Sequence, residues 1–479
     1  MLWLLFRYSV FAAFLLLALW FTIRHKHLEL LCLYFWAIAF ANCFVFAITI
    51  WTPAKVVSLF MLWCVLFHKK ERPPENRTLY DTFFTLYLIM VMLGNVAAVL
   101  SQFDVLVTKG SPFVRIVLQD FTYISAGILL FYGRLLKPGF APRLFHSYAI
   151  CVEVAILVAL VHLVFNAAGL SFMPIMRAVE HNASFEDASL SVKATFGGEK
   201  VLRVYVFAGE PKNLGFLIVP YLLMSITCYV NGKIRRSRFY HLAMLLLGTF
   251  ILVETFSSSA IIALILSLPV LLIYVLNGTN RKGFLIVFAC MLLATPFAVK
   301  KTFGPDALSV VDDKEFATAL FERTFERGYN ELSNGRQEVD IFEAYLDGGP
   351  MVMLFGWGVG QYTFHVEDSF TQDGALKTVQ SGVVLALADF GLVGILMYLL
   401  LSVILVRCVA HSLRSPSTYE KIYSLGAVSM YMGSLMYGSI YSCFIFLMVA
   451  HYIRLMRIEK YGDSDSYNQY RPVKRRSFA

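Results

Sequence analysis

The stretch LWLLFRYSVFAAFLLLALWFTI, residues 2–23, decides how the rest of the chain is interpreted. It has the length that a helix needs to cross a bilayer. The basic run Arg24-His25-Lys26-His27 follows it directly. Because the block is too long for a signal-peptide core and lacks a small-residue cleavage pattern, we interpret it as a membrane helix.

Similar apolar blocks recur along the 479 residues, and the composition agrees with them. Hydrophobic residues make up 58% and charged residues 15%, whereas a soluble globular protein carries roughly 25% charged residues. A disordered chain is also excluded, since disorder requires low hydrophobicity and high charge. We therefore predict an all-α, polytopic membrane protein with about 12–13 transmembrane helices. The predicted spans are residues 2–23, 29–50, 53–67, 82–100, 114–132, 146–168, 208–230, 239–254, 258–277, 283–299, 379–407, 422–437 and 439–456.

The 41 lysines and arginines against 32 acidic residues give a net charge of +9. When the predicted spans between them are counted, every basic cluster falls on one side of the membrane, which the positive-inside rule makes the cytoplasmic side. The C-terminus is therefore expected inside, and nucleic acid is not expected as a partner. The clusters are Arg24–Lys26, Lys69–Arg72, Arg134–Arg143, Lys233–Arg236, Arg281–Lys282, Arg407–Arg414 and Arg454–Arg476.

This topology predicts three groups of transmembrane helices, two long outer loops and a cytoplasmic tail. Loops of such length are usually functional when they are ordered. The helix groups are residues 1–168, 208–299 and 379–456, the outer loops are 169–207 and 300–378, and the tail is 457–479.

The larger outer loop contains apolar residues at helical spacing. Arg323 and Arg327 lie in a run that mixes acidic and basic residues, and the stretch Gln337–Leu346 places Ile341 four residues before Tyr345. Such spacing puts apolar side chains on one face of a helix. We expect amphipathic helices that lie over the membrane face.

Metal and disulfide chemistry find little support in the sequence. The eight cysteines lie in or at the edge of apolar segments, and none forms a CxxC pair, so a disulfide or a cysteine zinc site is not expected. Neither outer loop contains an HExxH, GxSxG or DxD pattern, which argues against metalloproteases, serine hydrolases and metal-dependent transferases. We expect no metal and no cofactor.

The end of the first outer loop carries charges just before a membrane helix. Arg203, Glu210 and Lys212 lie within ten residues of one another, and Pro211 suits the first turn of the helix that follows. An acidic residue at that position is favoured by the helix dipole. The group is either a substrate site or an ordinary helix cap with interfacial anchors, and the sequence favours neither.

Arg336, in Asn334-Gly335-Arg336-Gln337-Glu338, is the corresponding cation of the second loop. Arginine suits a diphosphate because its planar fork donates two parallel hydrogen bonds and keeps its charge. Arg203 and Arg336 would together clamp one diphosphate headgroup. The alternative is two solvated loop arginines.

Two other outer-loop residues are candidates. His365 has the chemistry of a general base near neutral pH, although a surface histidine without a role is the commoner case. Trp357 lies in the glycine run 354–362, which lacks the strand–turn–helix setting of a nucleotide loop.

Ionisable residues at membrane depth are functional candidates by default, because placing them there is costly. Their alternative position is the membrane interface. The predicted spans contain Asp120, Glu153, His162, Glu254 and Asp389.

The order of these motifs resembles that of the Wzy-type polysaccharide polymerases and O-antigen ligases. The resemblance rests on Arg203 with Glu210-Pro211, on Asn334-Gly335-Arg336, on residues 355–360 (FGWGVG) and on residues 385–394 (LALADFGLVG). It covers roughly residues 200–400, and the rest of the chain only through hydropathy.

The resemblance implies a metal-independent, membrane-embedded glycosyltransferase with a GT-C-like fold in the inner membrane. Such an enzyme moves a glycan from undecaprenyl diphosphate to a sugar hydroxyl, with a flippase and a chain-length regulator as partners. It would use Arg203 and Arg336 on the leaving diphosphate and Glu210 or His365 as base. The expected substrate-binding residues are Lys212, Arg323, Arg327, Trp357 and Gln380.

Two departures separate a polymerase from a ligase. Ligases usually carry a His-Asn pair where this chain has Gln380-Ser381, and a Ser-Arg pair where it has Ser257-Ser258-Ser259. Since glutamine cannot accept the proton, the leading hypothesis is a polymerase. A ligase, and a flippase or other transporter of lipid-linked oligosaccharides, stay as alternatives. A transporter more often shows paired halves and broken helices at the midplane.

Overall fold

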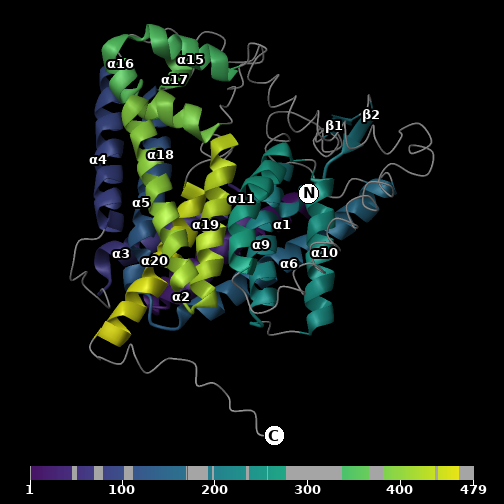
Figure 1. Ribbon diagram of the computed structural model, residues 1–479. Coiled ribbons are helices and arrows are strands. Elements are labelled where there is room, and N and C mark those ends of the chain that lie inside the picture. The colour runs from purple at the N-terminus through teal and green to yellow at the C-terminus, as the bar shows by residue number, and fades with distance from the viewer. Residues whose placement is uncertain are drawn as a thin grey trace, which may run out of the picture.

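The computed structural model describes residues 2–45, 51–69, 79–101, 112–168, 170, 193–196, 199–233, 237–255, 257–276, 337–365, 381–436 and 441–462. Within these residues the chain is almost entirely helical, and the helices form one tall bundle with a smaller helical cap at one end (Figure 1). The described strands are β1 (Lys193–Phe196) and β2 (Glu199–Leu202), which pair antiparallel as a hairpin.

Six of the described helices are long and apolar enough to cross a membrane, which agrees with the predicted membrane protein. The total of 12–13 spans stays a prediction, and the predicted span 283–299 lies outside the described residues. The six are α1 (Leu2–Ile23), α4 (Leu79–Leu100), α6 (Phe140–Ala167), α9 (Pro211–Val230), α11 (Ser258–Leu276) and α18 (Gly382–Arg414).

Further helices complete the bundle: α2 (His27–Ala39), α3 (Pro53–Phe67), α5 (Pro112–Tyr132), α10 (Arg238–Glu254), α19 (Thr418–Met436) and α20 (Tyr441–Gly462). Their limits follow local start signals. Thr52 caps α3, where its hydroxyl accepts the Lys55 N–H at 3.3 Å, and Pro53 occupies the first turn. The helix predicted at 29–50 is shorter in the structure, where α2 ends at Ala39.

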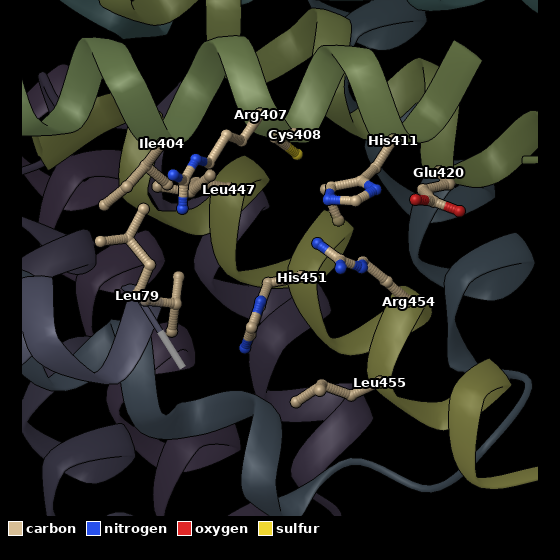
Figure 2. A pocket seen from close by; sticks show the side chains of 12 residues that line it. Leu79, Ile404, Arg407, Cys408, His411, Glu420, Leu447, His451, Arg454 and Leu455 are labelled. Carbon is tan, nitrogen blue, oxygen red and sulfur yellow. The ribbon is translucent and has the colours of Figure 1, made fainter. Parts of the chain in front are cut away.

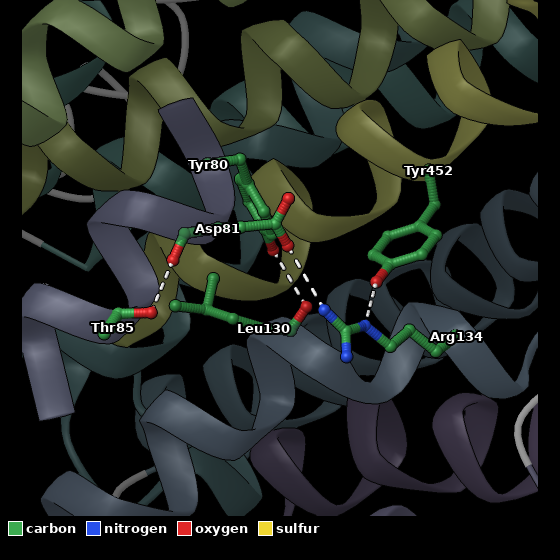
Figure 3. A network of polar contacts seen from close by, with 6 residues as sticks. All are labelled: Tyr80, Asp81, Thr85, Leu130, Arg134 and Tyr452. Carbon is green, nitrogen blue, oxygen red and sulfur yellow. Dashed lines mark hydrogen bonds and ion pairs between the residues drawn. The ribbon is translucent and has the colours of Figure 1, made fainter. Parts of the chain in front are cut away.

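One end of the bundle, which we call the basic end, brings together Arg134, Arg407 and Arg454 from three of the basic clusters. Arg134, in the short 3-10 turn after α5, forms an ion pair with Asp81 of α4 at 3.2 Å and donates through Nε to the Tyr452 hydroxyl of α20 at 3.2 Å (Figure 3). Its guanidinium also lies 4.3 Å from the centre of the Phe131 ring. Residues far apart in the sequence are thereby joined at this end.

We expect Arg134→Met to lower the free energy of unfolding by about 2 kcal/mol, because it leaves the Asp81 carboxylate without its cation. Both side chains are mostly buried, at 15% and 18% exposed, so solvent screens the pair only partly. Thermal unfolding in detergent measures the loss. A double-mutant cycle with Asp81→Asn isolates the pair, and additive effects of the two changes would contradict a direct coupling.

The opposite end, which we call the loop end, carries α15 (Gln337–Asp347), α16 (Gly349–Phe355) and α17 (Tyr362–His365) over α4 and α18 (Figure 1). The helix expected at Gln337–Leu346 is present as α15. Its apolar residues Ile341 and Tyr345 are buried against α18 and Trp357. The Tyr345 hydroxyl donates to the Met353 carbonyl, and burial raises the pKa of this phenol. One side of α15 therefore packs on protein, while its apolar residues Phe342 and Leu346 are exposed.

Glycines make this docking possible. Gly391 interrupts α18 with φ 59°, and a Cβ there would lie 2.6 Å from the Gly356 nitrogen. Gly358 has φ 93°, and a Cβ there would lie 2.0 Å from the Ala98 nitrogen of α4. Only glycine tolerates both the backbone angle and the close approach at these positions. The glycine run 356–360 is thus a packing joint between the cap, α4 and α18.

Candidate functional site

Arg203 lies at the loop end, where α10 gives way to α11. Its Nε donates to the Thr255 carbonyl at 3.0 Å, and the next residue, Val204, donates its N–H to the Glu254 carbonyl at 3.3 Å. Arg203 is partly exposed, whereas Val204 is fully buried. The bond to the Thr255 carbonyl anchors the guanidinium of Arg203 to the backbone between α10 and α11.

The segment that follows Arg203 is inserted into the bundle. Tyr205, Val206 and Ala208 are buried, and the Phe207 ring stacks on Phe40, the residue after α2, with a centroid distance of 4.9 Å. The Asn42 N–H donates to the Phe207 carbonyl at 2.9 Å. This packing fixes Arg203 relative to the bundle, as a positioned cation requires.

Glu210 and Lys212 stand at the first turn of α9. Pro211 is at the N1 position, as expected, but Glu210 makes no side-chain capping bond. Its carboxylate instead pairs with the Lys212 ammonium at 2.6 Å, with the two side chains 37% and 24% exposed. A partly exposed pair of this kind adds little to stability. It places one cation and one carboxylate side by side at the start of α9.

Arg203 and the starts of α9 and α11 belong to one neighbourhood. A Cβ on Gly215 of α9 would lie 2.6 Å from the Ala260 Cβ and 3.6 Å from the Ser257 Cβ. Ser257 and Ser259 share a hydrogen bond of 3.3 Å at the start of α11, directly after the Thr255 that holds Arg203. Two helix N-termini with hydroxyls and cations are a favourable setting for an anion. We call this the Arg203 site.

A cavity of about 190 Å³ opens between α2, α3, α5, α6, α9, α19 and α20. Phe216 lies in its wall one helical turn after Lys212, so both side chains share a face of α9. Lys55 and Ser58 of α3 and the buried Ser125 of α5 add polar groups to the wall. The rest of the wall is mainly apolar and aromatic: Tyr34, Phe35, Ile38, Ala54, Phe121, Thr122, Ala126, Tyr148, Leu217, Met430, Ile445 and Phe446.

Sequence reasoning missed Lys55 and this cavity. A lysine in the first turn of an apolar helix could have indicated a site. The same pattern is also typical of an interfacial anchor. The wall is formed by residues from seven helices, so no local sequence pattern predicts the cavity. The Ser257–Ser259 run was noticed only as a departure from a family motif, and its contact with the Arg203 anchor depends on the fold.

His365 and Trp357 belong to the cap and not to the Arg203 site. Trp357 is buried, its backbone N–H donates to the Ala388 carbonyl at 2.9 Å, and its ring contacts those of Tyr345 and His365. The His365 ring is parallel to it at a centroid distance of 6.1 Å. This arrangement is typical of packing residues. Arg336, Arg323, Arg327 and Gln380 lie outside the described residues.

The buried acidic residues have structural partners. Asp389, fully buried in α18, accepts the Tyr123 hydroxyl at 2.5 Å and the Gly360 N–H at 3.0 Å, so it ties α5 and the glycine run to α18. Glu153 accepts hydroxyl bonds from Tyr221 and Tyr240 at 3.3 and 3.0 Å. These carboxylates hold helices together.

The other ionisable candidates are placed as follows. Asp120 accepts the Asn95 amide at 2.7 Å and is only half-buried. Glu254 is buried, and its backbone carbonyl accepts the Val204 N–H. His162 packs edge-on against Tyr205, next to the Arg203 anchor. Glu254 and His162 therefore support the segment that positions Arg203.

A second cavity, of about 240 Å³, lies at the basic end between α4, α18, α19 and α20. Figure 2 shows the Arg407 and Arg454 side chains extending into it, with His411 and His451 on either side of the Arg454 guanidinium. Glu420 lines its far side. The cavity offers a cationic niche at the end opposite to the Arg203 site.

No protein-family model matches the chain, and no curated protein matches it either.

Proposed function

We propose that the protein is a polymerase that joins undecaprenyl-diphosphate-linked oligosaccharide repeats into a surface polysaccharide. The observation that carries this proposal is the Arg203 site: a positioned arginine and a lysine at two helix starts, one turn along α9 from an aromatic cavity. An anionic headgroup on an apolar lipid needs that combination of cations and apolar wall.

In this mechanism the acceptor hydroxyl attacks the anomeric carbon of the donor, while the bond from that carbon to the diphosphate oxygen breaks. The departing diphosphate carries the developing negative charge, which Arg203 and Lys212 stabilise together with Arg336 from the second loop. The proton of the acceptor hydroxyl passes to a carboxylate or an imidazole.

Glu210 is the better placed of the two proposed bases. It stands at the start of α9 beside Lys212, whereas His365 is stacked on Trp357 in the cap. Arg323, Arg327, Trp357 and Gln380 keep their proposed roles in binding the glycan. The mechanism uses protein cations for charge stabilisation and is proposed as metal-independent.

The proposed location is the inner membrane, with the basic end and the C-terminus toward the cytoplasm and the loop end outside. The proposed fold relation is to GT-C-like glycosyltransferases. A flippase would supply the substrate, and a chain-length regulator would set the length of the product.

A flippase for the same lipid is the second candidate, because the basic-end cavity has the cations such a protein needs on the cytoplasmic side. Arg407 and Arg454 extend into that cavity from α18 and α20 (Figure 2). We favour the polymerase because its catalytic step needs a positioned site at the loop end, and the Arg203 site provides one. A ligase stays an alternative. The sequence argues against it, because it has Gln380 where ligases usually carry a histidine.

Deletion of the gene separates these candidates. A strain without a polymerase should display single repeat units on its surface glycan, seen as one short band on a glycan gel. A strain without the flippase should display no repeat units, and a strain without a ligase should retain long chains that are not attached to the acceptor. Retention of attached long chains would contradict all three functions.

A further inference from the structure

Three histidines meet at the basic end, well apart from the Arg203 site. His25 and His27 flank the turn from α1 to α2, and His68 follows the last residue of α3. One ring nitrogen from each histidine lies within 4.8 Å of the corresponding nitrogens of the other two. The ring centroids of His25 and His27 lie 4.3 and 5.1 Å from that of His68.

The backbone at His25 points to a role for its side chain. The Lys26 N–H donates to the Phe21 carbonyl and the His25 N–H to the Thr22 carbonyl, at 2.8 and 3.1 Å. These two bonds form a Schellman cap, in which the residue at the His25 position is left-handed and usually glycine. His25 has φ 53° there. The histidine therefore occupies a left-handed backbone position at which glycine would be less strained.

His68 shows a matching feature. Its Nδ1 is buried and has no hydrogen-bond partner among the described residues. Buried polar atoms nearly always have a partner, so an atom of this kind calls for a ligand or an ordered water. His27 is positioned from its backbone, since its carbonyl accepts the Tyr132 hydroxyl at 2.9 Å. Its ring is thus presented by a fixed helix start.

We propose that His25, His27 and His68 bind one divalent transition-metal ion of the zinc type. Neutral imidazoles are preferred ligands of zinc, copper and nickel. In a tetrahedral zinc site, nitrogens about 2.0–2.1 Å from the ion lie about 3.3 Å from one another. Metal binding therefore requires the rings to rotate so that nitrogens now within 4.8 Å of one another reach that spacing.

The surroundings define the fourth position. Lys26 and Lys69 are exposed beside the three histidines, and the Arg24 guanidinium lies 4.7 Å from the centre of the Trp20 ring. These cations repel a divalent ion bound beside them, and they favour an anion as the fourth ligand because it offsets that repulsion. The bound ion links the α1–α2 turn to the end of α3, as a structural cross-link between the first helices.

Zinc binding to the full-length protein tests the proposal. The protein is purified in detergent without a polyhistidine tag, stripped with a chelator and titrated with Zn²⁺ in a calorimeter, and with Co²⁺ for its absorption spectrum. We expect one equivalent of Zn²⁺ to bind, a tetrahedral Co²⁺ spectrum and a higher unfolding temperature with zinc. Absence of this stoichiometric binding would overturn the proposal.

Variants separate a metal ligand from a packing role. His68→Ala should weaken zinc binding at least about 100-fold, because even changes behind the ligands cost about 10–100-fold. His25→Gly should lose the zinc-dependent rise in unfolding temperature while the metal-free protein is as stable as before or more so, since glycine suits the cap. His146→Ala, elsewhere at the basic end, should bind zinc normally. Normal binding by His25→Gly and His68→Ala would refute the site.

Discussion

Arg203→Ala should abolish polymer growth and leave single repeat units on the cell surface, while the amount of protein in the membrane stays unchanged. The charge on the departing diphosphate then loses its positioned cation, and removal of one such donor typically costs about 10²–10³-fold in rate. The side chain is partly exposed and its Nε bonds to a backbone carbonyl, so its replacement should disturb the fold little. Glycan gels of complemented deletion strains measure chain length.

Two further variants sharpen that result. Arg203→Lys keeps the charge but loses the planar fork, so chains should be short or absent. Arg238→Ala removes an exposed arginine at the other end of α10, the helix whose C-terminal end holds Arg203 through Thr255, and should give normal chains. Normal chain length in Arg203→Ala would remove this residue from the mechanism. The same test applies to Arg336→Ala in the second loop.

Gly358→Ala should detach the helical cap from the bundle and lower the free energy of unfolding by more than about 4 kcal/mol. The left-handed backbone at this position costs an alanine about 1–2 kcal/mol. The larger effect comes from the Ala98 nitrogen, which would lie 2.0 Å from the new Cβ. Because the close neighbour is helix backbone and not a flexible side chain, relaxation requires the glycine run to move away from α4.

Limited chymotrypsin digestion in detergent reports this detachment. Trp357 and Phe364 are buried in the folded protein, so cleavage after them should appear only in the variant. Gly139→Ala is the matched control: Gly139 has φ 83°, but a Cβ there meets nothing within 4 Å. It should show only the backbone cost, with the cap still protected. Equal cleavage and equal stability of the two variants would mean that the close approach of Gly358 to α4 does not contribute to the loss of stability.

Local patterns predicted much of the fold. The spans expected at 2–23, 53–67 and 258–277 match α1, α3 and α11 to within a residue, because apolar length and flanking signals such as Pro53 are local properties. The helix at Gln337–Leu346 was also predicted from its spacing. Its surface was assigned less well: Ile341 and Tyr345 face α18 and Trp357, since a spacing rule shows that a face is apolar but not what covers it.

The candidate site was predicted only in part. Arg203, Glu210 and Lys212 were selected because they stand just before a membrane helix and because their order resembles a family motif. Their setting depends on contacts between distant segments, such as the bond from Arg203 to Thr255. Lys55 was missed for the same reason.

By itself, the sequence determined that this is a helical membrane protein, where several of its helices begin and end, and which charges stand near their ends. These properties depend on the transfer of short apolar segments from water to lipid and on hydrogen bonds between near neighbours. The tertiary structure alone decided which of those charges meet. It joined Arg203 to the α10–α11 break, placed Trp357 in a packed joint and brought His68 to His25 and His27. The physical reason is that helix packing depends on the fit of side chains from segments far apart in the chain, and no local pattern contains that fit.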